Sequence, residues 1–278
     1  MKYIICSLIF LSITSVFAQN RRYCIVGDTG TGQEIQYRIS KVMELRNCDE
    51  VLITGDIIYP DGISSSSDPQ IETKFFKPFK NLFDKGVEMT LSMGNHDYRG
   101  NIGAWIEVAS TEPLLNFPKK YFYFIKNNIC FVSLDTNDHF DEQANWLQKE
   151  VYPVFKNQSC SYILAFAHHP YKSSGAHGNS KGEVKRFLKK NIIGKVDAFF
   201  GGHDHFLSYE GKKKGTRLFV SGAGAKLRWT RFWKRPPYKA KKQGFVAMDV
   251  FEDKIEYKFV VLGIGVSSKI TYQVTEDL

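Results

Sequence analysis

One domain of the α/β class is the fold that this sequence of 278 residues predicts, and three observations lead to it. In the first two-thirds of the chain, short apolar runs typical of buried strands alternate with segments whose apolar residues recur at helical spacing. The last third consists mainly of strand-like runs, which predicts a β-rich C-terminal half. No internal repeat and no linker rich in proline or glycine divides the chain, so we expect a single domain over residues 19–278.

The N-terminal half should begin with a short strand at residues 23–27 and a helix at residues 33–46. A second strand is expected at residues 50–54, and the serines at 64–67 are typical of a polar loop. The remaining elements expected here are a helix at 71–84, a strand at 88–93 and a hairpin of 120–125 and 129–134 around Asn127-Asn128.

The C-terminal half should begin with a helix at residues 141–155, where Trp146, Leu147 and Val151 lie on one side. The three lysines at 212–214 indicate a turn between strands. The other elements expected here are a helix at 181–191 and strands at 162–167, 196–200, 217–220, 244–250, 254–262 and 269–274.

The first 18 residues have the pattern of a secretory signal peptide. Lys2 precedes an uncharged, largely apolar run at residues 3–17, and Ala18 lies at a cleavage-like site. We therefore expect an exported protein, in a periplasmic, secreted or lysosomal-type compartment. An uncleaved anchor is the alternative, and we expect no transmembrane span in the mature chain because no later apolar run is long enough.

Four cysteines follow the signal, namely Cys24, Cys48, Cys130 and Cys160. An exported protein can oxidise them to disulfides, but Cys24 and Cys130 lie in apolar runs where buried thiols are equally common. Both alternatives stay open, and so does the connectivity of any disulfides.

Five polar motifs stand directly after apolar strand candidates. Their metal-binding side chains are Asp28, Asp56, Asn95, His168 and the pair His203 and His205. The carboxyl ends of strands in an α/β sheet meet at one edge, where ligands bind. Carboxylate, amide and imidazole donors suit Fe, Mn and Zn, and no cysteine lies in any motif. The sequence therefore predicts a metal centre at one sheet edge.

These motifs resemble the five blocks of the metallophosphoesterase superfamily, also called calcineurin-like phosphoesterases. The blocks are Gly27-Asp28-Thr29-Gly30, Gly55-Asp56-Ile57-Ile58-Tyr59, Gly94-Asn95-His96-Asp97, Ala167-His168 and Gly202-His203-Asp204-His205. Within the superfamily they are most similar to purple acid phosphatases of the small tartrate-resistant type. Two details favour that branch: Gly30 stands where other members carry a ligand histidine, and Tyr59 follows Asp56 by three residues. A phenolate is a hard ligand that favours Fe(III).

The resemblance implies a four-layer α/β/β/α sandwich and an exported acid phosphatase with two metals. It assigns Asp28, Tyr59 and His205 to Fe(III), and Asn95, His168 and His203 to a divalent Fe, Zn or Mn, with Asp56 bridging the two. His96 and His177 would contact phosphate and supply the proton for the leaving group. Phosphate monoesters would then be hydrolysed by metal-bound hydroxide, and His139 and His169 match no motif residue and are interpreted as structural.

Two rival functions stay open at this point. One is a phosphodiesterase or nucleotidase of the same superfamily, and the other is a binding protein with a relict site. Small phosphorylated substrates are the expected partners, without an obligate nucleic-acid partner.

The formal net charge of +9 is concentrated in one stretch, residues 226–242, which we call the basic segment. It has no acidic residue, and its cations are Lys226, Arg228, Arg231, Lys234, Arg235, Lys239, Lys241 and Lys242. Interleaved aromatic residues make the composition compatible with nucleic acid, an anionic membrane or a solvated loop. We favour a loop near the rim of the active site that attracts an anionic partner, namely phosphorylated substrates.

Overall fold

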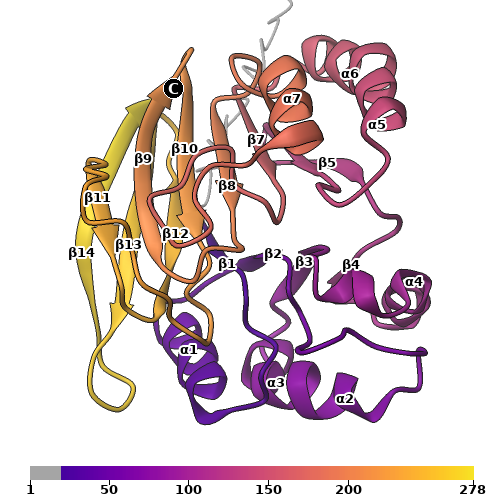
Figure 1. Ribbon diagram of the computed structural model, residues 1–278, viewed down its shortest axis with the longest axis vertical. Helices are drawn as coiled ribbons and strands as arrows, with labels where there is room; N and C mark the ends of the chain where they lie inside the picture. Colours follow the sequence, from indigo (N-terminus) through magenta and orange to yellow (C-terminus); the bar gives the residue numbers. More distant parts are fainter. Residues whose placement is uncertain (1–19) are drawn as a thin grey trace, which may run out of the picture.

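The computed structural model describes residues 20–278, which form two seven-stranded mixed sheets flanked by helices (Figure 1). The first sheet has the order β14-β13-β12-β1-β2-β3-β4 and the second β11-β9-β10-β8-β7-β6-β5. The strands of the first sheet are β1 Arg21–Val26, β2 Glu50–Thr54, β3 Glu88–Ser92, β4 Leu115–Asn116, β12 Gly244–Val250, β13 Lys254–Leu262 and β14 Ser268–Asp277. Those of the second are β5 Phe122–Lys126, β6 Ile129–Ser133, β7 Tyr162–Phe166, β8 Ala198–Gly201, β9 Leu207–Lys213, β10 Thr216–Ser221 and β11 Tyr238–Ala240.

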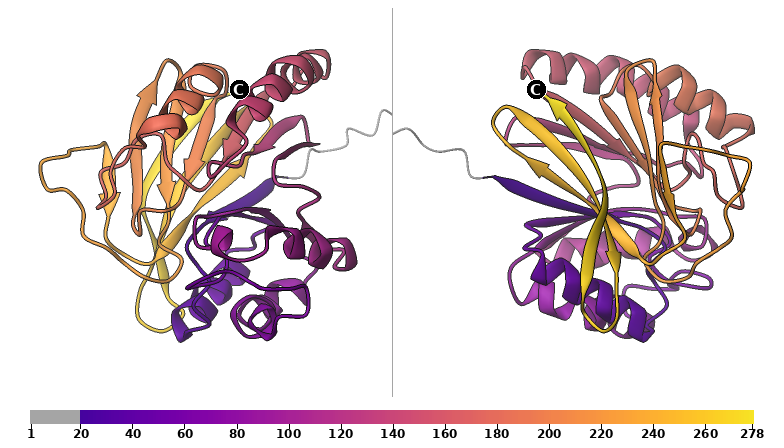
Figure 2. Two further views of the ribbon diagram at one scale, coloured as in Figure 1. Left: turned by 45° about the vertical axis from the view of Figure 1, so that its right-hand side comes forward. Right: turned by 90° about the vertical axis from the view of Figure 1, so that its left-hand side faces the viewer.

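The helices lie on the outer faces of the two sheets, so the molecule has four layers (Figures 1 and 2). They are α1 Glu34–Leu45, α2 Pro69–Ile71, α3 Lys77–Phe83, α4 Ile102–Thr111, α5 Phe140–Trp146, α6 Tyr152–Asn157 and α7 Gly182–Asn191. π-Helical turns at Glu72–Phe76 and Leu147–Val151 join α2 to α3 and α5 to α6. The expected four-layer α/β/β/α fold is confirmed.

Three hydrophobic clusters separate the four layers, and the side-chain alternation of β1 explains how. Cys24 and Val26 face a cluster shared with α1, α3 and α4, while Tyr23 and Ile25 face the cluster between the two sheets. A third cluster joins the other face of the second sheet to α5, α6 and α7. Successive side chains of a strand point to opposite faces, so a strand buried on both faces is apolar throughout.

Most of the expected elements are present, with shifts of one to three residues at many ends. The hairpin of β5 and β6 turns at Asn127 and Asn128, and both residues have positive φ angles, 49° and 61°. This is the backbone that a tight two-residue turn needs. Helix α4 and strands β4, β9 and β11 were not among the elements expected from the sequence.

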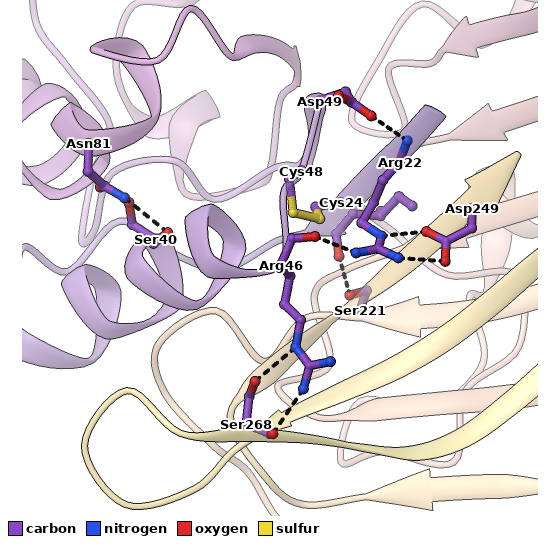
Figure 3. Close-up of a disulfide and its surroundings, with 11 residues drawn as sticks. Arg22, Cys24, Ser40, Arg46, Cys48, Asp49, Asn81, Ser221, Asp249 and Ser268 are labelled. Atoms are coloured by element: carbon purple, nitrogen blue, oxygen red, sulfur yellow. Dashed lines mark hydrogen bonds and ion pairs between the residues drawn. A yellow bond between two sulfur atoms is a disulfide. The ribbon is translucent and has the colours of Figure 1, made fainter. Parts of the chain in front are cut away.

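The four cysteines whose state the sequence left open form two disulfides. Cys24 pairs with Cys48, and Cys130 with Cys160, with a Cα–Cα distance of 5.8 Å in each pair. The first joins β1 to Cys48, two residues before β2, and lies beside a polar network on β1 (Figure 3). Disulfides of this kind are typical of proteins in oxidising compartments.

The signal-peptide prediction for residues 1–18 lies outside the described residues. Within residues 20–278, no helix combines the length and the apolar character that crossing a membrane requires.

The polar network on β1 leads to a stability prediction. Asp249 on β12 faces Arg22 on β1 in register, with Nε–Oδ1 and Nη2–Oδ2 distances of 2.5 and 2.8 Å (Figure 3). Asp249 also accepts a hydrogen bond from Lys258 Nζ at 2.7 Å. Burial raises the pKa of Asp249, but the bonds from Arg22 and Lys258 outweigh it and hold the pKa below its usual value. Asp249→Asn should therefore destabilise the protein by about 2 kcal/mol at pH 7.

The sign of the pH dependence follows from that lowered pKa. The carboxylate stabilises the folded state above its unfolded pKa of about 3.9, and this contribution is lost as the pH falls through the folded value. Urea unfolding from pH 7 to pH 3 should show the gap between wild type and Asp249→Asn closing below about pH 4. Glu252→Gln, which changes an exposed neighbour, is the control. A gap that is constant with pH would contradict the prediction.

Candidate metal centre

The five motif loops meet because the strands that precede them are parallel within each sheet. Strands β1, β2 and β3 are parallel neighbours in the first sheet, and β7 and β8 are parallel neighbours in the second. Their carboxyl ends therefore open at a common edge. Backbone hydrogen bonds connect the loops, from Asp28 N to Gly55 O at 2.9 Å and from Gly202 N to His168 O at 2.8 Å.

Three of the candidate ligands have unusual backbone angles. Asp28, Asp56 and His203 have φ values of 60°, 53° and 64°, in the left-handed region that non-glycine residues rarely adopt. Such residues concentrate at functional sites, where the surrounding structure compensates for the strain. Gly94 allows the close approach of two loops, because a Cβ at this position would lie 2.1 Å from Asp56 Oδ1.

The first group of donors surrounds the phenol of Tyr59, which is 6% exposed. Its oxygen lies 3.1 Å from Asp28 Oδ1, 2.9 Å from Asp56 Oδ2 and 3.3 Å from His205 Nε2. Burial, and then the charges of Asp28 and Asp56, raise the pKa of the Tyr59 phenol far above its usual value. Burial also raises the pKa of Asp28 to about 6. A cation among these oxygens would reverse this cost, because it stabilises the ionised forms.

The second group of donors surrounds His168, which is fully buried. Its Nδ1 lies 2.9 Å from the carbonyl oxygen of Thr54, and since a carbonyl only accepts, Nδ1 carries the proton and Nε2 offers a lone pair. Nε2 lies 3.0 Å from Asn95 Oδ1, 3.2 Å from His203 Nδ1 and 3.4 Å from Asp56 Oδ1. Burial, followed by neighbouring histidines, lowers the pKa of both His168 and His203, which keeps them neutral as metal ligands must be.

Asp56 connects the two groups, because Oδ2 faces Tyr59 and Oδ1 faces His168. In the second group, the lone pair of His168 Nε2 meets two acceptor oxygens, an arrangement that favours a cation between them. The donor set of carboxylates, phenol, amide and imidazoles therefore fits two metal ions of the Fe, Mn or Zn kind. His168 also belongs to two clusters of potential metal ligands, one with Asp28 and Asp56 and one with His169 and His203.

The two histidines expected to contact phosphate pack against different donor groups of this centre. The His96 ring packs edge-on against Tyr59 at 4.6 Å between centroids, and its Nδ1 lies 2.5 Å from the Pro60 carbonyl. The His177 ring packs against His203 at 4.2 Å. The guanidinium of Arg228 lies 3.1 Å from His177 Nε2, so this nitrogen accepts and the imidazole is neutral.

The two histidines differ in which ring nitrogen is already engaged. Burial, and less strongly the charge of Arg228, lower the pKa of His177. In His96 the Nδ1–H donates to the Pro60 carbonyl, which leaves Nε2 available.

Two buried aspartates within the motifs position the loops, a role that the sequence argument did not assign. Asp97 accepts from the backbone N–H groups of Ile57, Ile58 and Gly94, so it connects the loop after β2 to the loop after β3. Asp204 accepts from the N–H groups of His177 and Gly178 and also contacts the Ser173 hydroxyl. The available signal was their place within the motifs: Asp97 comes two residues after Asn95, and Asp204 lies between His203 and His205.

The two histidines interpreted as structural have different surroundings. His169 lies beside the centre, with its ring 4.6 Å from that of His203 and its Nδ1 3.0 Å from the Thr136 hydroxyl. Burial lowers its pKa to about 4. His139 lies apart, with Nε2 3.0 Å from Lys120 Nζ.

The basic segment reaches the rim of the centre, where we expected it. Lys226 Nζ lies 5.3 Å from the ring centroid of Tyr59, and the backbone N–H of Arg228 donates to the His205 carbonyl at 3.1 Å. Arg231 donates to the carbonyls of Gly175 and Ala176 in the loop that carries His177.

Comparison with known proteins identifies this arrangement. The model of the calcineurin-like phosphoesterase family matches residues 21–207, which include all the motif loops. The chain belongs to the calcineurin-like phosphoesterase family. The resemblance inferred from the motifs is thus confirmed, and the chain is a hydrolase of the binuclear-metal phosphoesterase type.

Alignments with two acid phosphatases cover most of the chain. Purple acid phosphatase 7 of Arabidopsis thaliana is 25% identical over 265 residues, which cover 84% of this chain and 80% of that protein. Tartrate-resistant acid phosphatase type 5 of Rattus norvegicus is 26% identical over 243 residues, covering 74% and 73%.

Solved structures support the fold of this family member. The purple acid phosphatase PPD1 of yellow lupin has a TM-score of 0.68 at 16% identity, covering 92% of this chain and 53% of that one. GAP50, described as the anchor in the inner membrane complex of Plasmodium, has a TM-score of 0.72 at 16% identity, covering 93% and 89%.

Proposed function

We propose that this phosphoesterase is an exported acid phosphatase that hydrolyses phosphate monoesters at an Fe(III)–divalent metal pair. The observation that carries the proposal is the convergence of seven donor side chains in two groups that share Asp56. Asp28, Tyr59 and His205 would hold Fe(III), and Asn95, His168 and His203 would hold divalent Fe, Zn or Mn. When bound, such a pair supplies positive charge and a water of lowered pKa for in-line attack on phosphorus.

The protein's own residues would orient the ester and move its proton. His96 Nε2 is available to donate a proton to the leaving oxygen, while Nδ1 stays fixed on the Pro60 carbonyl. His177 Nδ1–H would contact a phosphate oxygen, and Asp204 would keep that loop in place through its bonds to the backbone.

Export is supported by the two disulfides, which persist in oxidising compartments. N-terminal sequencing of protein secreted by an expression host tests the prediction that residues 1–18 are removed. A mature chain that begins at Met1 would contradict it.

Turnover of matched esters tests the reaction itself. Protein reconstituted with Fe(III) and Zn(II) should hydrolyse p-nitrophenyl phosphate with kcat/KM at least about tenfold above that for bis(p-nitrophenyl) phosphate between pH 4 and pH 7. The two esters share a leaving group and differ in the charge on phosphorus, so the ratio reports on the phosphate site. A preference for the diester would reject the monoesterase and favour the phosphodiesterase alternative. No turnover of either ester, with both metals bound, would reject both.

A further inference from the structure

The start of the basic segment is built into the wall of the metal centre. Gly224 N donates to the Gly27 carbonyl and Arg228 N to the His205 carbonyl, each at 3.1 Å. The backbone between these bonds therefore holds Lys226 and Arg228 at the rim, beside the loops that carry Asp28 and His205. Beyond Arg228 the segment runs without helix or extended strand to β11 and projects from the sheets (Figure 2).

Lys226 and Arg228 each stand beside a different group of metal donors. Lys226 Nζ lies 5.3 Å from the Tyr59 ring centroid, on the side of the first group. Arg228 Nη1 lies 3.1 Å from His177 Nε2, and the His177 ring packs on His203 of the second group. The His177 side chain lies between Arg228 and His203. The Arg228 guanidinium is therefore one side chain further away than the metal-donor groups that would hold the reacting phosphate.

These two cations have no acidic partner among residues 20–278. None of the ion pairs formed there includes a cation of the basic segment, and both Lys226 and Arg228 are exposed. Arg231 and Lys239 differ, because their side-chain N–H groups donate hydrogen bonds to backbone carbonyls. These two side chains therefore stabilise the segment. Arg228 has five N–H donors and its contact with His177 uses one of its two Nη groups, so most of its fork remains available.

We propose that Lys226 and Arg228 form a second anion subsite, which makes phosphate monoesters with a second phosphate group the preferred substrates. This inference rests on the proposed monoesterase function and specifies its substrate class. The metal groups would take the reacting phosphate, while Lys226 and Arg228 would bind the other phosphate by charge-assisted hydrogen bonds. A guanidinium can bind two oxygens of a phosphate at once, whereas the lysine adds a point charge.

The test compares adenosine 3′,5′-bisphosphate with adenosine 3′-phosphate and adenosine 5′-phosphate at one ionic strength. The wild type should show a kcat/KM for the bisphosphate at least about tenfold above either monophosphate, mainly through KM. Lys226→Ala and Arg228→Ala should each reduce this preference to about threefold or less, and Arg228→Lys should retain more of it than Arg228→Ala. The matched control is the double variant Lys241→Ala/Lys242→Ala, which removes two exposed cations of the same segment and should keep the preference.

The outcomes separate the subsite from the reaction. Equal kcat/KM for all three nucleotides would overturn the subsite and leave the monoesterase intact. Loss of the preference in the Lys241→Ala/Lys242→Ala variant, to the same extent as in Arg228→Ala, would overturn it in favour of a diffuse charge effect. Failure to hydrolyse adenosine 5′-phosphate, adenosine 3′-phosphate and p-nitrophenyl phosphate would reject the proposed function instead.

Discussion

Asp56→Asn is expected to lower kcat for p-nitrophenyl phosphate by at least about 10³-fold, which corresponds to about 4 kcal/mol in the barrier. Asp56 is 1% exposed, and its two carboxylate oxygens face Tyr59 in one donor group and His168 in the other. Asparagine keeps one oxygen but removes the charge and places an N–H₂ group where the second ligand atom was. Elemental analysis should therefore find fewer than two metals per chain.

A fall in activity alone would not separate metal loss from unfolding. Without metal, Asp56 is a buried carboxylate close to Asp28, so its neutral replacement should keep or raise the thermal midpoint of the metal-free protein. Asp61→Asn, in the same loop but exposed and paired with Arg99, is the matched control and should keep both metals and activity. An Asp56→Asn protein with two metals and more than about a tenth of the activity would contradict the bridging role.

Tyr59→Phe is expected to abolish the visible absorption of the iron-loaded protein. A phenolate bound to Fe(III) produces a charge-transfer band, so the wild type should be pink to purple. The Tyr59 oxygen lies within 3.3 Å of three other donors, and its removal leaves the ring in place against His96. The visible spectrum, recorded with the iron content of the same sample, measures the effect.

Tyr98→Phe provides a control for this spectral prediction. Tyr98 comes directly after the motif that contains His96, but its hydroxyl contacts Asp135 instead of the metal donors. This variant should keep the colour. A colourless wild type that is active and fully loaded with iron would refute the tyrosinate assignment, and so would a Tyr59→Phe protein that stays purple.

The fold could be anticipated wherever a local pattern determines the structure. Strands β2, β12 and β13 have the predicted ends, because apolar runs bounded by turn residues mark them clearly. Helix α4 and strand β9 were missed. Strand β9 begins two residues after His205, and its buried first half pairs with β11, which lies about 30 residues further along the chain. Such contacts, which no local periodicity reveals, override propensity.

For the candidate centre, the sequence by itself determined the donor types and their positions after strand ends. That information is local: each motif consists of a strand end, a glycine and a polar side chain within a few residues. It also determined that the excess positive charge is concentrated in the basic segment.

Only the tertiary structure decided which side chains meet. The pairing of the cysteines, the bonds of Asp97 and Asp204 to neighbouring loops, and the contact of Arg228 with His177 all join residues from different elements or loops. Strand order sets these contacts: β1 to β3 belong to one sheet and β7 and β8 to the other, and only their packing brings Asp56 to His168. The physical reason is that long-range packing fixes distances between side chains, whereas the local sequence fixes only the conformation of each segment.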